Sequence, residues 1–189
     1  MNETLNTILK RRSTRQYTTE EVKQEDLDLI LEAAVNSPSA MNSQPWHFTV
    51  VNDQAILQEI SDAAKEVGKN HPDKQMQAMA NNPHLHLFYK APVAILISCK
   101  DDAPEGLLSC AAATENILLA AESLGLGSCW IQFVELLFAT KNPIADSILK
   151  KLAIPEGYSF NHAVVLGHKL SDTTPPKKLK SETITYIKK

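Results

Sequence analysis

The stretch Leu107–Phe133, LLSCAAATENILLAAESLGLGSCWIQF, predicts a helix followed by a short strand. Residues Leu107–Leu124 contain neither Pro nor Gly and are rich in Ala and Leu, which are the best helix formers. Gly125 and Gly127 are expected to end the helix, because Gly tolerates the left-handed turn that follows a helix end. Ser128–Ile131 is a short apolar run, which is typical of a strand.

Polar residues recur every seven positions along this helix. Ser109, Asn116 and Ser123 share one strip, with Glu115 and Glu122 beside it, because two helical turns take about seven residues. A helix that is apolar over the rest of its surface must be covered on several sides, by its own domain or by a second subunit. Taken alone, this pattern indicates only a core helix and a core strand.

Length and composition favour one globular domain over residues 1–189, with 43% hydrophobic and 22% charged residues. A net charge of −3 gives no reason to expect nucleic acid or membrane as a partner, and no apolar run approaches the roughly 20 residues of a membrane span. The N-terminus lacks the apolar core of a signal peptide. Cys99, Cys110 and Cys129 form no CxxC pair, so we expect buried thiols in a reducing cytoplasm and no metal framework.

Two segments carry candidate ligand-binding side chains. Arg11-Arg12-Ser13-Thr14-Arg15 is a dense set of anion donors, since Arg presents a planar fork that suits phosphate or carboxylate. A solvated basic loop is the alternative interpretation. The loop Ser37–Trp46 is bracketed by two prolines and contains small hydroxyl and amide side chains, which suit a polar, planar ligand.

The remaining elements follow from periodicity and turn residues. Helices are predicted at Glu3–Lys10, Thr18–Asn36, Gln54–Glu66 and Asn142–Leu152, and strands at His47–Val51, Ala94–Ser98, His162–Gly167 and Thr183–Ile187. Between Gly68 and Lys90, His84 and His86 have no Cys or acidic partner at ligand spacing. We therefore expect surface or lid histidines there rather than a metal site.

Three motifs in this order, Arg11-Arg12-Ser13-Thr14-Arg15, then SPSAMNSQPWHFTVV, then the helix that ends in GLGSCWI, resemble the FMN-dependent nitroreductase family. The resemblance extends from Ile8 to the C-terminal strand. It implies an α+β fold with a mostly antiparallel central sheet flanked by helices. It also implies an intertwined homodimer with FMN at the subunit interface. The helix Leu107–Leu124 would form the dimer core, and the last strand would cross to the partner's sheet.

The resemblance also implies roles for individual residues. Arg15 would approach N1 and O2 of the flavin ring and serve as the catalytic cation. The other implied FMN contacts are Arg11, Arg12 and Ser13 at the phosphate and ribityl chain, Pro38, Ser39 and Asn42 from the other subunit, Trp130, Ile131 and Gln132 beside the N5 edge, and Lys177 or Lys178 closing on the phosphate. The family often has a Gly near position 132 or 133, and this chain has none.

The implied activity is that of an oxidoreductase that uses NADH or NADPH to reduce nitroaromatic, quinone or related acceptors in a ping-pong mechanism. Two alternatives stay open. One is a flavoenzyme of the same fold with other chemistry, such as dehalogenation, azoline oxidation or flavin fragmentation. The other is a non-catalytic module that holds FMN. A nucleic-acid module that uses the arginine motif is a more distant possibility, since the rest of the chain is not basic.

Overall fold

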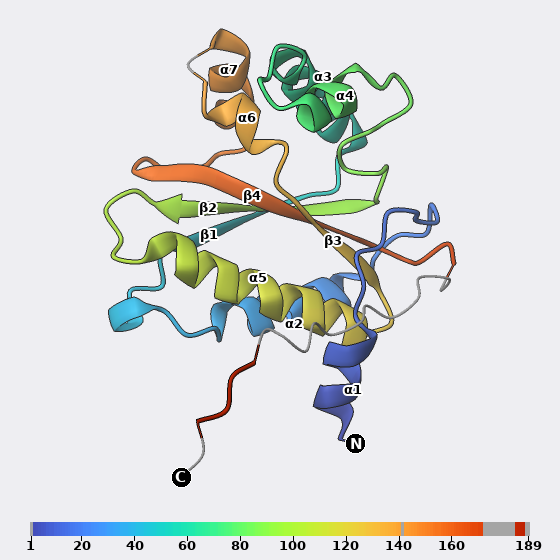
Figure 1. The fold of residues 1–189 in the computed structure, drawn as a ribbon, viewed down its shortest axis with the longest axis vertical. Helices are drawn as coiled ribbons and strands as arrows, with labels where there is room; N and C mark the ends of the chain where they lie inside the picture. Colours follow the sequence, from blue (N-terminus) through green and yellow to red (C-terminus); the bar gives the residue numbers. More distant parts are fainter. Residues whose placement is uncertain (1, 141, 172–183, 188–189) are drawn as a thin grey trace.

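The computed structural model describes residues 2–140, 142–171 and 184–187 (Figure 1). Within these residues, β1 (Trp46–Val51), β2 (Val93–Lys100), β4 (Tyr158–Gly167) and β3 (Gly127–Ile131) form an antiparallel sheet in the order β1-β2-β4-β3. Helices α2 (Gln24–Val35) and α5 (Gly106–Ser123) lie on one face of the sheet. Helices α3 (Gln54–Gly68), α4 (Lys74–Asn81), α6 (Glu135–Phe138) and α7 (Pro143–Lys151) lie on the other. The predicted α+β fold with an antiparallel sheet is confirmed.

Each face of the sheet has its own apolar core among the described residues. Alternate residues of a strand point to opposite faces. Accordingly, Val164 and Leu166 of β4 pack with α2 and α5, whereas Ala163 and Val165 pack with the helices of the other layer. Strand β2 is buried along nearly its whole length, which explains why its sequence is apolar without alternation.

Two residues of the polar strip predicted on α5, Ser109 and Asn116, find partners outside the helix. The Ser109 hydroxyl accepts from the Ala40 N–H at 3.3 Å. The Asn116 amide donates to the Ser37 hydroxyl at 2.7 Å and to the Ala33 carbonyl at 3.0 Å. These bonds fasten α5 to α2 and to the loop that follows it. Buried residues at spacings of three and four face the sheet, as predicted from the helical period.

The two glycines after α5 have different reasons to be glycine. Gly125 has φ +78° and ends the helix as predicted. For Gly127 the prediction was wrong, because this residue begins β3 and has no left-handed backbone. A Cβ atom at Gly127 would lie 2.7 Å from Thr14 Cγ2, so the position needs glycine to allow close approach of the two chain segments.

The predicted helix Thr18–Asn36 was wrong at its start, since α2 begins at Gln24. The backbone before it is held in an extended form by other partners. Tyr17 forms an antiparallel bridge with Lys169, and the Thr18 N–H donates to the His168 carbonyl at 3.0 Å. Local helix propensity therefore gives way to pairing with the segment that follows β4.

Helix α1 (Glu3–Lys10) matches its prediction in both ends, and the other predicted elements agree within a few residues. Two short helices, α4 and α6, were not predicted. The three cysteines are buried free thiols, as expected. Residues 184–187 have no regular secondary structure in the single chain, and Thr183 lies outside the described residues, so the predicted strand Thr183–Ile187 in the partner's sheet stays a prediction. Across the described chain, no helix is long and apolar enough to cross a membrane.

Candidate functional site

The arginine motif runs along the edge of the sheet beside β3. The Thr14 N–H donates to the Ser128 carbonyl at 2.8 Å, and Ser13 forms a parallel bridge with Ser128. The Tyr17 hydroxyl donates to the Thr14 carbonyl at 2.6 Å. Backbone bonds therefore fix the motif against β3, and the arginine side chains extend from a defined base.

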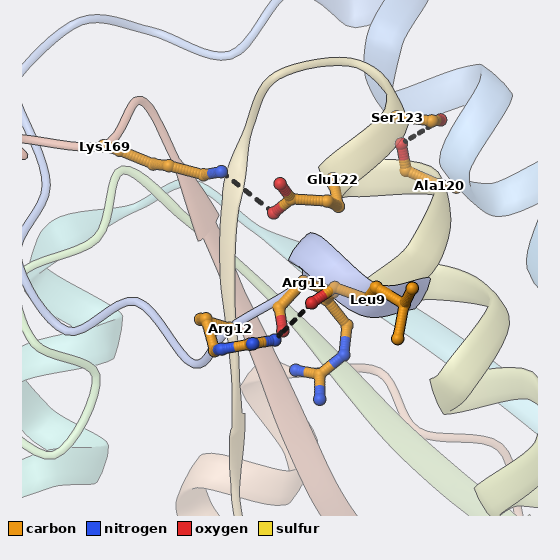
Figure 2. Close-up of polar contacts among 7 residues, drawn as sticks. All are labelled: Leu9, Arg11, Arg12, Ala120, Glu122, Ser123 and Lys169. Atoms are coloured by element: carbon orange, nitrogen blue, oxygen red, sulfur yellow. Dashed lines mark hydrogen bonds and ion pairs between the residues drawn. The ribbon is translucent and has the colours of Figure 1, made fainter. Parts of the chain in front are cut away.

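Arg11 and Arg12 follow directly after α1. Arg11 Nε lies 4.0 Å from Glu115 Oε1 of α5. Arg12 Nη1 donates to the carbonyls of Leu9 at 2.8 Å and Arg11 at 2.6 Å (Figure 2). Arg12 Nε is buried and has no hydrogen-bond acceptor among the described residues. A buried, charged donor without a partner is costly, so this N–H calls for an acceptor supplied by a ligand.

Lys169 and Glu122 form an ion pair close to the arginines (Figure 2). Lys169 Nζ lies 2.9 Å from Glu122 Oε2, and both side chains are largely buried. The cluster thus holds three cations, Arg11, Arg12 and Lys169, against two carboxylates, Glu115 and Glu122. The excess of one positive charge over negative charge suits an anion.

Arg15 lies over the ring of Tyr89, with its Cζ 5.9 Å from the ring centroid. Its guanidinium is exposed, and its Nη1 lies 3.5 Å from the Ser13 carbonyl oxygen. A surface ion pair of Arg15 with the nearby Glu20 is not what the described residues show, since Glu20 Oε1 faces His168 Nε2 at 3.6 Å. Arg15 is therefore exposed and contacts Tyr89, whereas Arg11 faces Glu115 of α5.

Trp130, Ile131 and Gln132 lie at the end of β3 and just beyond it. The Ile131 side chain is buried, whereas Trp130 is 37% exposed. The Trp130 indole N–H donates to Gln132 Oε1 at 3.1 Å, and the Gln132 amide donates to Glu135. On its inner side, the indole stacks on the ring of His162, with centroids 4.3 Å apart and planes 20° apart. The indole is thus held by two contacts while part of it reaches solvent.

Burial shifts the pKa values of several groups around this edge. It lowers the pKa of His162 to about 4, so the imidazole is neutral near pH 7. It raises the pKa of Tyr17 and the pKa of the Cys129 thiol. Neither Tyr17 nor Cys129 is therefore an ionised nucleophile or base at neutral pH.

The loop with Pro38, Ser39 and Asn42 lies away from the arginine motif in space. It contacts the N-terminal end of α5 through Ala40, whereas Glu122, near Lys169, lies at the other end of the same helix (Figure 1). Met41, Asn42 and Gln44 all have positive φ values, between 45° and 55°. Such backbone is strained in residues other than glycine and often marks functional loops. One protomer does not bring this loop to the arginine motif.

Three further points concern the remaining predicted contacts and the histidines. Lys177 and Lys178 lie outside the described residues. Among the described residues no group of three His, Cys, Asp or Glu side chains is placed to hold a metal. His84 is exposed as predicted, but His86 is buried, with its Nδ1 accepting from the Phe88 N–H at 3.1 Å.

Several residues at this site were not predicted as site residues from the sequence. His162 and Val164 looked alike as residues of a core strand, and Glu115, Glu122 and Lys169 looked like ordinary surface charges. Only their spatial proximity to the arginine motif or to Trp130 distinguishes them. An isolated histidine inside an apolar strand was the one feature that could have raised the question.

A separate cavity of 740 Å³ lies between the start of α2, the start of α3 and the segment before β2. It is lined by Thr18, Thr19, Glu21, Val22, Lys23, Gln24, Leu27, Asn52, Gln54, Gln58, His86, Lys90, Pro92 and Val93. None of the predicted contact residues lines it. This cavity is therefore distinct from the candidate site, whose residues lie along β3 and α5.

Comparisons with known proteins bear on this surface. Residues 8–168 match the model of the nitroreductase family. A nitroreductase with bound FMN from Bacteroides fragilis is 34% identical, with a TM-score of 0.88 and 100% of both chains covered. A nitroreductase with bound FMN from Desulfitobacterium hafniense is 33% identical, with a TM-score of 0.91 over 100% of both chains. The FMN reductase (NAD(P)H) of Bacillus subtilis is 31% identical over 98% of this chain and 74% of that protein.

Proposed function

Because the chain belongs to the nitroreductase family, we propose that it is an FMN-dependent oxidoreductase that uses NADH or NADPH to reduce nitroaromatic, quinone or related small-molecule acceptors. The single observation that supports FMN best is the buried Arg12 Nε, which has no acceptor among the described residues. A phosphate oxygen is a strong acceptor for such a donor.

The residues present fit the phosphate end of FMN. Arg11 and Arg12 supply cations at the end of α1, and Ser13 supplies a hydroxyl beside β3. Lys169 is already paired with Glu122, so its charge is largely compensated. The arginines are therefore the donors that we assign to the phosphate, and Arg11 would exchange its distant contact with Glu115 for a closer one.

The proposed ring end lies toward Arg15, Trp130 and Gln132. When bound, FMN supplies the capacity to accept a hydride from the nicotinamide and to pass it to a second substrate. Arg15 would stabilise negative charge at the N1 edge, which develops only after the hydride has arrived. Trp130 and Gln132 would border the opposite edge, and both are held by hydrogen bonds.

We further propose a homodimer in which Pro38, Ser39 and Asn42 of one subunit border the site of the other. Exposed apolar side chains support this arrangement, among them Leu5, Ile8 and Leu9 of α1, Leu107 and Leu108 of α5, and Met41. The outer edge of β1 pairs with no strand among the described residues, and Ile187 is 98% exposed. A second copy would cover these surfaces and complete a two-sided site.

The proposed function is tested by purification and anaerobic reduction. We expect a yellow protein whose flavin absorbance is bleached by NADH or NADPH and recovers when a quinone or nitroaromatic is added. A protein that binds FMN without bleaching would be the non-catalytic module. Bleaching that is reversed by oxygen alone, with no response to either acceptor, would favour another chemistry on the same fold. A colourless protein with no affinity for added FMN would overturn the proposal.

A further inference from the structure

His162 lies in β4 at a position where an apolar residue would be expected. The residue is 1% exposed, and its ring points to the same side of the sheet as Val164 and Leu166, toward Thr114 of α5. The strand partner of His162 is Ile97, which is also buried. Burying an imidazole among apolar side chains carries a desolvation cost that Val or Leu would avoid. The position therefore requires an explanation beyond packing.

One hydrogen bond fixes the tautomer of the ring. The Thr114 hydroxyl donates its single hydrogen to the Cys110 carbonyl at 2.9 Å, one turn earlier on α5. The same oxygen lies 2.5 Å from His162 Nε2 and must accept there, so Nε2 carries the proton. In the neutral ring Nδ1 is then an unprotonated acceptor, and it is buried without a donor among the described residues.

The outer face of the same ring supports Trp130. The two rings are nearly parallel at 4.3 Å, and the Trp130 N–H is held by Gln132 at 3.1 Å. A continuous series of contacts thus runs from Thr114 on α5 through His162 and Trp130 to Gln132. Within this series, Trp130 and Gln132 reach solvent, whereas Thr114 and His162 are buried.

We propose that His162 is a positioning residue, whose ring sets the plane of the Trp130 indole and, through it, the orientation of the planar ring system bound beside β3. This inference rests on the proposed function, which puts the flavin and its acceptor next to Trp130. The bond to Thr114 satisfies the buried Nε2, and the flat face of the ring provides the surface on which the indole packs. A rigid ring that borders a reacting atom controls the approach geometry of that atom.

The test compares two replacements at position 162. His162→Phe keeps a flat ring beneath Trp130 and removes both ring nitrogens, while His162→Leu fills similar space without a flat ring. We expect His162→Leu to lower kcat/KM for a benzoquinone about tenfold, below the ~100-fold that a misplacement of ~1 Å can cost. His162→Phe should stay within about twofold of the parent, and the Kd for FMN should change less than about twofold in both, because the phosphate donors are untouched.

A spectroscopic readout follows Trp130 without any turnover. The chain has two tryptophans, so Trp46→Phe leaves Trp130 as the only indole. In that background, the near-ultraviolet circular dichroism of the FMN-free protein should fall for His162→Leu and persist for His162→Phe. Leu166→Val is the matched control, since Leu166 is buried on the same face of β4 and does not stack on Trp130. It should leave both the indole signal and kcat/KM at parent values.

Three results would contradict the proposed role of His162. Equal kcat/KM and an equal indole signal in His162→Leu and the parent would overturn the inference, and so would a Leu166→Val variant that behaves like His162→Leu. If both His162 variants lose the signal and the rate together, the flat ring is not the essential feature and the proposal fails in its stated form. If the parent binds no FMN, the proposed function fails, while the indole signal still reports whether His162 orients Trp130.

Discussion

The backbone of Gly127 in β3 lies directly against the side chain of Thr14, so that a Cβ atom at Gly127 would be 2.7 Å from Thr14 Cγ2 and 2.8 Å from Thr14 Cβ. This contact sets the distance between the arginine motif and the strand that carries Trp130. The Thr14–Ser128 backbone bond of 2.8 Å next to it closes the same junction. The phosphate end and the ring end of the proposed site are therefore held by one close contact.

Gly127→Ala should separate these two segments. We expect a loss of about 1–3 kcal/mol in the free energy of unfolding, as for other overpacked positions, together with weaker FMN binding. Urea unfolding and fluorescence titration of FMN measure the two effects. Adding Thr14→Gly, which removes the clashing side chain, should restore part of both. A double variant no better than the single one would show that Thr14 is not the obstacle.

Arg11→Ala should weaken FMN binding by about 1.5–3 kcal/mol, the scale of a hydrogen bond to a charged group, and leave turnover largely intact at saturating FMN. Glu115→Gln offers the opposite change, since it removes the carboxylate that Arg11 now faces at 4.0 Å. It should bind FMN as tightly as the parent or more so. Lys10→Ala, a nearby exposed cation, serves as the control for bulk charge. Unchanged affinity in Arg11→Ala would remove Arg11 from the phosphate.

Arg15→Gln should lower the two-electron midpoint potential of bound FMN by tens of millivolts, given that about 30 mV corresponds to 1.4 kcal/mol. The reason is that a cation near N1 favours the reduced, negatively charged flavin over the neutral oxidised form. A redox titration measures the shift. Arg15→Lys keeps the charge and should keep most of the potential. If Arg15→Gln holds FMN at the parent potential, Arg15 does not lie at the N1 edge.

Leu108→Glu should disrupt the proposed dimer. Leu108 of α5 is 68% exposed in one chain, and a carboxylate there cannot be buried in an apolar interface without a large desolvation cost. Sedimentation velocity at micromolar concentration should show a smaller species that has lost FMN. Ile144→Glu is the matched control, because Ile144 is 56% exposed on α7, in the opposite layer. The idea fails if the parent itself is a folded monomer with FMN bound.

The buried His162 predicts a specific pH dependence of stability. Burial lowers its pKa from 6.5 to about 4, so the unfolded chain takes up the proton at a higher pH than the folded chain does. The stabilisation is complete above pH 6.5 and is lost as the pH falls toward 4, by about 3 kcal/mol in total. The free energy of unfolding, measured with urea, should therefore fall more steeply between pH 7 and pH 4.5 in the parent than in His162→Phe. His84→Gln, a change at an exposed histidine, should follow the parent. Parallel declines in the parent and His162→Phe would place the titration elsewhere.

The sequence was sufficient for features that depend on neighbours in the chain. Helix α1, the helical period of α5, the left-handed turn at Gly125 and the apolar strand β2 all follow from local propensity and periodicity. The order of the three motifs also predicted the family, and the comparison over residues 8–168 confirms it. The contacts predicted for individual site residues stay predictions, since FMN and a second chain are needed to test them.

Tertiary structure alone decided the features that depend on residues distant in the chain. Residues 18–23 are not helical, contrary to their helix-like composition, because the segment after β4 pairs with Tyr17 and Thr18. Gly127 looked like a second helix stop, but it is needed for the approach of Thr14. The support of Trp130 by His162, and of His162 by Thr114, joins residues 32 and 48 positions apart. Sequence periodicity predicts which face of a strand or helix a side chain occupies. Which residue that side chain contacts is decided by how the sheet and α5 pack together.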